Sequence, residues 1–111
     1  MENKIVLQNG VLVVTCEGEL DLHVAEQYRT SIDAELERTE ARYLVFDMEK
    51  VTFIDSSGLG MMLGRYQKVC QRGGNVALCA VPSKMNRMLE VSGLKSLMNA
   101  YATRQEAMER V

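Results

Sequence analysis

Two adjacent serines stand between an aspartate and the first of three glycines in the segment DSSGLGMMLG, residues 55–64. A strand-like run ends at Ile54, and an apolar-periodic stretch typical of a helix follows it. In α/β proteins, functional sites commonly lie where a strand ends and a helix begins. Serine hydroxyls and closely spaced glycines at this point could serve a nucleophilic hydrolase, a dinucleotide site or a docking surface.

The two enzyme-like interpretations match their motifs poorly. A serine hydrolase with a G-x-S-x-G turn would need a glycine where Asp55 stands, and His23 is the only imidazole in the chain. A dinucleotide site would need G-x-G-x-x-G, whereas these glycines are spaced G-x-G-x-x-x-G. No acidic residue ends the strand expected at Ala80 to bind a ribose. A small nucleotide-binding or serine-hydrolase domain therefore stays as the alternative from another functional class.

A helix expected over residues 56–72 would have two different sides, since successive residues are 100° apart. The side toward the sheet is predicted to carry Leu59, Met62, Leu63, Tyr66, Val69 and Cys70. The solvent-facing side is predicted to carry Ser57, Gly60, Met61, Gly64 and Lys68. Exposed glycines cost a helix about 1 kcal/mol each relative to alanine. A flat docking surface beside Ser57 explains them better than a helix cap alone.

The elements around this segment predict one α/β domain over residues 1–111, with a mixed sheet of four to five strands and about four helices. Asn9-Gly10 predicts a hairpin turn at the N-terminal end of the sheet. Strands are expected at residues 4–8, 11–17, 43–48 and 75–80, with an apolar run at 51–54 before the next helix and a short edge strand within 97–101. Helices are expected at residues 22–40, 56–72, 83–91 and from 103 onward, with N-caps at Asp21, Ser83 and Thr103. Asp47 and Glu49 are predicted to lie in a turn that ends a strand.

Composition excludes several kinds of partner. The formal net charge is −2 and the pI is about 5.4, so no basic surplus exists to bind nucleic acid directly. No apolar run approaches the ~20 residues of a membrane span, and the protein is expected in the cytoplasm. Three scattered cysteines and a single histidine predict neither a disulfide framework nor a metal site. We therefore expect no metal and no cofactor on this chain.

Residues 53–66 resemble the phosphorylation segment of the anti-sigma factor antagonists, the bacterial STAS domains. Three further stretches match landmarks of that family: Gly-Glu-Leu-Asp at residues 18–21, Gly-Gly at 73–74 and Ser-Gly-Leu at 92–94. The resemblance covers essentially the whole chain, and the shared run is most similar to the sporulation branch, the antagonists of the anti-sigma F factor. The chain departs from the family pattern at Leu22-His23, where two histidines are common, and at Met61-Met62, where Val-Ile is common.

The resemblance implies a regulator that switches partners and is not itself an enzyme. The unphosphorylated form would bind an anti-sigma factor kinase, which carries the ATP or ADP, and would release the sigma factor. The kinase would phosphorylate the second serine, which maps to Ser57, and a PP2C-type phosphatase would restore it. The implied partner-binding residues are Asp21, Ser56, Ser57, Gly58, Gly60, Met61 and Gly64. A general-stress antagonist that serves another sigma factor is the alternative within the family.

Overall fold

The computed structural model describes residues 4–111, and a five-stranded mixed sheet in the order β1-β2-β3-β4-β5 runs through it. The first two strands are antiparallel, and every other neighbouring pair is parallel. The strands are β1 (Ile5–Gln8), β2 (Val11–Leu20), β3 (Tyr43–Ile54), β4 (Asn75–Cys79) and β5 (Asn99–Tyr101). The predicted α/β class and the N-terminal hairpin are confirmed.

The hairpin turn has the backbone conformation that Asn-Gly predicts. Asn9 has φ 51° and Gly10 has φ 81°, and the flanking residues Gln8 and Val11 face each other across the two strands. Both central residues of a type I′ turn need positive φ, which asparagine and glycine accept most readily.

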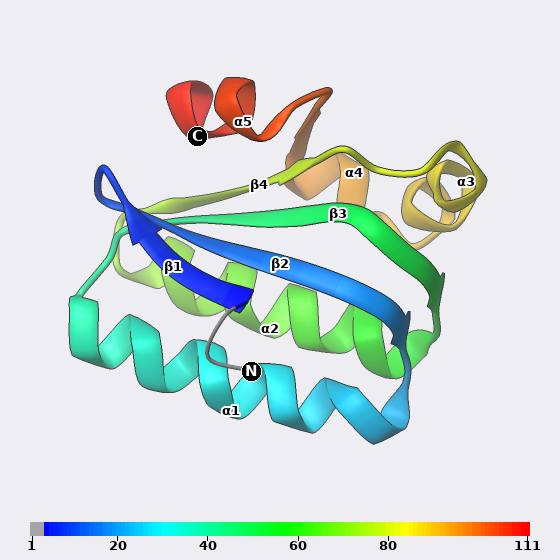
Figure 1. Ribbon diagram of the computed structural model, residues 1–111, viewed down its shortest axis with the longest axis horizontal. Coiled ribbons are helices and arrows are strands. Elements are labelled where there is room, and N and C mark those ends of the chain that lie inside the picture. Colours follow the sequence, from blue (N-terminus) through cyan, green and yellow to red (C-terminus); the bar gives the residue numbers. More distant parts are fainter. Residues whose placement is uncertain (1–3) are drawn as a thin grey trace.

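Within residues 4–111, five helices pack around the sheet: α1 (Leu22–Thr39), α2 (Ser56–Gln71), α3 (Ser83–Val91), α4 (Leu94–Leu97) and α5 (Arg104–Arg110). The two long helices, α1 and α2, lie side by side under one face of the sheet, and α5 lies over the other (Figure 1). The helix beyond the expected number is α4, whose four residues are too few to show a helical period in the sequence.

The core between the sheet and the two long helices holds the larger side chains. Phe46 of β3 and the α1 residues Tyr28, Ile32 and Leu36 are almost completely buried there. Full burial of such a side chain contributes about 1.5–3 kcal/mol. The Tyr28 hydroxyl accepts a hydrogen bond from the backbone N–H of Glu17, 3.2 Å away, where the β2–β3 register shifts. A buried hydroxyl therefore satisfies a backbone donor at this irregularity.

Two strands are longer than predicted. The second strand continues to Leu20, and residues 43–54 form one strand in which the exposed Glu49 and Lys50 interrupt the apolar pattern without ending it. The turn predicted at Asp47 and Glu49 is therefore wrong. The pairing of β3 with β2 carries the strand through this polar stretch, where Lys50 lies opposite Glu17.

The N-caps of the shorter helices differ in detail from the prediction. Pro82, not Ser83, stands at the N-cap of α3, and no side chain caps that helix. Thr103 caps α5 as predicted, since its hydroxyl accepts from the backbone N–H of Glu106 at 3.1 Å. The Glu106 carboxylate accepts from the N–H of Ala102 rather than from that of Thr103. In a standard capping box this carboxylate would accept from the N–H of the N-cap residue, whereas here it accepts from the residue before the N-cap.

Asp47 fixes α5 to the sheet. Its side chain is buried in β3, and its Oδ2 lies 3.0 Å from Nε and 2.8 Å from Nη2 of Arg104, the first residue of α5. The same Nη2 donates to the Thr15 hydroxyl at 2.9 Å. One guanidinium therefore joins α5 to both β2 and β3.

We expect Arg104→Gln to lower the free energy of unfolding by about 1–3 kcal/mol, because it leaves the Asp47 carboxylate buried without its charged partner. Urea unfolding at neutral pH measures the loss. Arg110→Gln, an exposed change in the same helix, should alter stability by no more than about 0.5 kcal/mol. Equal stabilities of the two variants would contradict the role assigned to Arg104.

Candidate partner-binding site

The predicted site lies where β2 and β3 end and the two long helices begin (Figure 1). Leu20 and Ile54 are paired as the last residues of these parallel strands.

Each strand is followed by an aspartate with φ −111° and ψ −174° that caps the next helix. Asp21 Oδ1 accepts from the N–H of His23 at 3.0 Å, and Asp55 Oδ1 accepts from Ser57 at 2.8 Å and from Gly58 at 3.1 Å. Each cap is worth about 1 kcal/mol and fixes where its helix starts.

A close backbone approach holds the start of α2 against the end of β2. The N–H of Asp55 donates to the carbonyl of Leu20 at 3.2 Å. A Cβ on Gly58 would lie only 2.3 Å from that same carbonyl oxygen, so only glycine fits there. Gly58 is buried. We therefore assign it to internal packing and not to the partner-binding surface predicted from the sequence.

Three residues of α2 form what we call the glycine face: Ser57, Gly60 and Gly64. Gly60 is exposed, and the other two are partly exposed. A Cβ added at Gly60 or Gly64 would meet no atom within 4 Å. Packing inside the domain therefore gives no reason for either glycine. Ser56, in the first turn of the same helix, is also exposed.

The prediction that Met61 lies on the solvent-facing side is wrong. Its side chain is only 5% exposed, because α1 lies beside α2 and covers it. Helix α2 consequently has two buried sides, one against the sheet and one against α1. Met62 and Val69 are buried as predicted, while the other predicted core residues are only partly buried: Leu59, Leu63, Tyr66 and Cys70.

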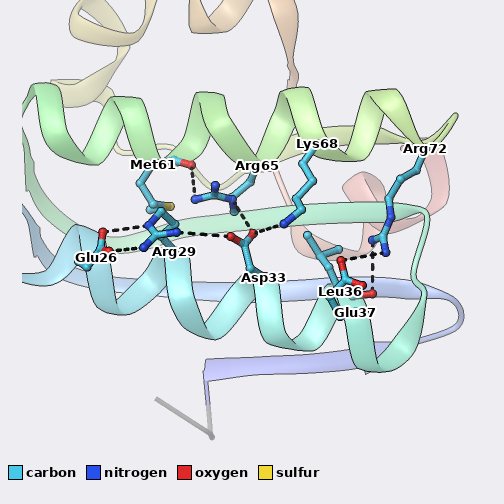
Figure 2. Close-up of polar contacts among 9 residues, drawn as sticks. All are labelled: Glu26, Arg29, Asp33, Leu36, Glu37, Met61, Arg65, Lys68 and Arg72. Carbon is cyan, nitrogen blue, oxygen red and sulfur yellow. Dashed lines mark hydrogen bonds and ion pairs between the residues drawn. The ribbon is translucent and has the colours of Figure 1, made fainter.

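A charged cluster between α1 and α2 has no counterpart in the sequence prediction. Arg65 is 8% exposed, and its Nε lies 2.9 Å from Oδ1 of Asp33, as an ion pair without linear hydrogen-bond geometry (Figure 2). Lys68 Nζ lies 3.5 Å from the same oxygen. Burial lowers the pKa of Arg65, and the Asp33 charge opposes that shift. Nothing local to α2 indicates this contact in the sequence, because Asp33 belongs to α1.

A groove of about 230 Å³ opens between the first turns of α1 and α2. Its floor and rim are formed by Leu22, Ala25, Glu26, Arg29, Ser57, Gly60 and Met61. Leu22 is 71% exposed at its mouth, which is a large exposure for a leucine. Arg29 donates from Nε to Glu26 Oε2 at 2.9 Å, and this hydrogen bond lowers the pKa of Glu26.

The groove brings Ser57 together with residues of α1. No histidine lines the groove that Ser57 shares. Across residues 4–111, no group of three or more His, Cys, Asp or Glu side chains could hold a metal ion. Within the same residues, no helix has the length and apolar character needed to cross a membrane. Ser57 lies in the first turn of α2, on the same side of the helix as Gly60 and Gly64, where an added Cβ would meet no other atom within 4 Å.

Residues 4–107 match the family model described as the STAS domain. The chain belongs to the STAS domain family. The family expected from residues 53–66 is therefore confirmed, and the match extends over nearly all of this STAS domain.

Relatives of this STAS domain include regulators of sigma factors. An anti-sigma F factor antagonist of Paenibacillus polymyxa is 38% identical over 99 residues, which are 89% of this chain and 85% of that protein. An anti-sigma-B factor antagonist of Staphylococcus aureus strain NCTC 8325 is 27% identical over 92 residues, which are 83% of this chain and 84% of that protein.

The fold of this STAS domain also matches the anti-sigma factor antagonist SpoIIAA. The unphosphorylated form aligns with a TM-score of 0.82 at 30% identity, covering 95% of this chain and 90% of that one. The phosphorylated form of SpoIIAA, a Bacillus cell fate determinant, aligns with a TM-score of 0.74 and covers 95% of this chain and 94% of that one, again at 30% identity.

Proposed function

We propose that this STAS domain is an anti-sigma factor antagonist whose unphosphorylated form binds an anti-sigma factor kinase and so releases a sigma factor. The observation that carries the proposal is the glycine face, an open and uncharged helix surface headed by a serine. Relatives named as anti-sigma factor antagonists support the class of partner. The proposed contact residues are Asp21, Ser56, Ser57, Gly60 and Gly64.

Phosphorylation of Ser57 turns this binding off in the proposed mechanism. A phosphate there adds close to two negative charges at the first turn of α2, where the helix dipole favours an anion. The Asp55 cap already fixes the N–H groups of Ser57 and Gly58, so the helix start stays in place. The phosphate therefore changes the surface and leaves the fold intact, and its bulk and charge exclude the partner.

The remaining parts of the cycle are supplied by partners. The kinase brings the ATP, and a PP2C-type phosphatase removes the phosphate. The STAS domain itself contributes no cofactor and no catalytic residue, and it acts in the cytoplasm without contact to nucleic acid or membrane. Its share of the mechanism is to present Ser57 in two states.

The proposed sigma factor is sigma F, the sporulation factor, because the relative at 38% identity is named an antagonist of the anti-sigma F factor. The anti-sigma-B relative at 27% identity makes a general-stress circuit the alternative. Release assays with both anti-sigma factors, each loaded with its own sigma factor, distinguish the two. Preferential release of sigma B would replace the sporulation assignment.

Incubation with the cognate kinase and ATP is expected to add one phosphate, at Ser57, as measured by mass mapping of peptides. Ser57→Ala should remain unmodified, whereas Ser56→Ala should be modified like the parent. The two phosphorylation states should melt cooperatively at similar temperatures. A phosphate found on Ser56, or full modification of Ser57→Ala, contradicts the assignment.

A further inference from the structure

The groove beside Ser57 is lined by the guanidinium of Arg29, whose ion pairs are weak. Arg29 forms a two-point ion pair with Glu26, one turn earlier in α1, and its Nη1 lies 3.9 Å from Asp33. The side chains of Arg29 and Glu26 are 46% and 67% exposed. Ion pairs this exposed typically contribute about 0–1 kcal/mol, so the guanidinium can exchange partners at little cost.

Arg29 shares the groove with Ser57, and its side chain leans toward the start of α1. Both α1 and α2 begin at the same edge of the sheet (Figure 1), and Glu26, Arg29 and Ser57 line the same groove between them. Helical side chains lean toward the N-terminus of their helix, and the pairing of Arg29 with Glu26 follows this direction. Figure 2 shows the guanidinium of Arg29 close to Glu26 and below Met61, on the side of α1 that faces α2.

We propose that Arg29 is the counter-ion of a phosphate on Ser57, and that it leaves Glu26 to bind this phosphate across the groove. The inference rests on the proposed phosphorylation of Ser57. A phosphate dianion carries more charge than the Glu26 carboxylate and accepts the same two-point contact from a guanidinium. The released Glu26 turns into the solvent that already surrounds it.

The exchange costs the rest of the α1–α2 contact little. Asp33 keeps Arg65 at 2.9 Å and Lys68 at 3.5 Å when Arg29 moves away. The new pair joins the two helices across the mouth of the groove, over Gly60 and Met61, which are among its lining residues. Phosphorylation thus fills the groove from within the domain, in addition to placing charge on the glycine face.

The test uses the full chain with phosphoserine encoded genetically at position 57, so that no kinase is needed. Phosphorus NMR follows the second ionisation of the phosphate between pH 4 and pH 9. An adjacent cation favours the dianion, so Arg29→Gln is expected to raise the phosphate pKa by about 0.5–1 unit above that of the parent. Glu26→Gln removes the carboxylate that competes for Arg29, and it is expected to lower the phosphate pKa.

Arg38→Gln is the matched control. Arg38 pairs with Glu35 in the same three-residue spacing on α1, but in the last turn, far from the start of α2. It should leave the titration of the phosphate unchanged. Coincident titrations of the parent and Arg29→Gln, or equal shifts in Arg29→Gln and Arg38→Gln, overturn the capture of the phosphate.

The outcome is independent of the proposed function. Because the phosphoserine is encoded, a kinase that ignores Ser57 or a partner that still binds the phosphorylated chain defeats the proposed switch without altering the titration. Conversely, coincident titrations remove the role of Arg29 and leave phosphorylation of Ser57 standing.

Discussion

Gly60→Glu is expected to weaken binding of the unphosphorylated protein to the anti-sigma factor kinase about 100-fold while the domain stays folded. Gly60 lies one turn after Ser57 on the glycine face, with open space where a side chain would project. An unpaired carboxylate buried in an interface costs several kcal/mol, and about 2.7 kcal/mol corresponds to 100-fold in affinity. Calorimetric titration with the kinase, in the presence of ADP and of ATP, measures the loss.

Gln105→Glu is the control for the added charge. Gln105 is exposed in the first turn of α5, on the opposite face of the sheet from α2 (Figure 1). This variant should bind like the parent. The stability of Gly60→Glu should equal or exceed that of the parent, because glutamate favours a helix over glycine. If folded Gly60→Glu binds with the parent's affinity, the glycine face is not the interface.

Local signals in the sequence predicted most of the fold. Asn9-Gly10 specified the hairpin because few other residues accept two positive φ angles in succession. The period of buried residues in α1 was readable because they recur every three or four positions: Ala25, Tyr28, Ile32 and Leu36. The aspartate at position 21 marked the start of α1 because a short carboxylate can accept from a first-turn N–H. Each of these features depends on residues close together in the chain.

The errors occurred where a second element decides the environment. The angular argument placed Met61 in solvent because it assumed a single buried side, whereas α1 covers it. Asp47 resembled a turn residue because its partner, Arg104, is 57 residues away. The groove between α1 and α2 follows from the same pairing of helices. A pattern within one helix contains no information on which helix lies beside it.

The three glycines of α2 show the same distinction most sharply, since only the tertiary structure separates them. A Cβ on Gly58 would collide with the Leu20 carbonyl of β2, while one on Gly60 or Gly64 would meet no atom within 4 Å. Replacing glycine with alanine should therefore stabilise the domain at positions 60 and 64, and destabilise it at position 58.

Gly58→Ala is accordingly expected to lower the free energy of unfolding by about 3 kcal/mol, at the upper end of the usual cost of overpacking. The new methyl group would lie 2.3 Å from the Leu20 oxygen, which is a backbone atom and already accepts from Asp55. Separating the strand end from the helix start would strain that hydrogen bond and the Asp55 cap. Gly60→Ala and Gly64→Ala should each raise stability by up to about 1 kcal/mol.

Urea unfolding of the three alanine variants under one set of conditions measures these differences directly. Equal stabilisation by all three would show that α2 can move away from β2, and the close approach would not be what requires Gly58. Destabilisation by Gly60→Ala or Gly64→Ala would show that these positions contact other parts of the domain. In that case both glycines would have an internal role, and their presence on α2 would no longer support a docking surface beside Ser57.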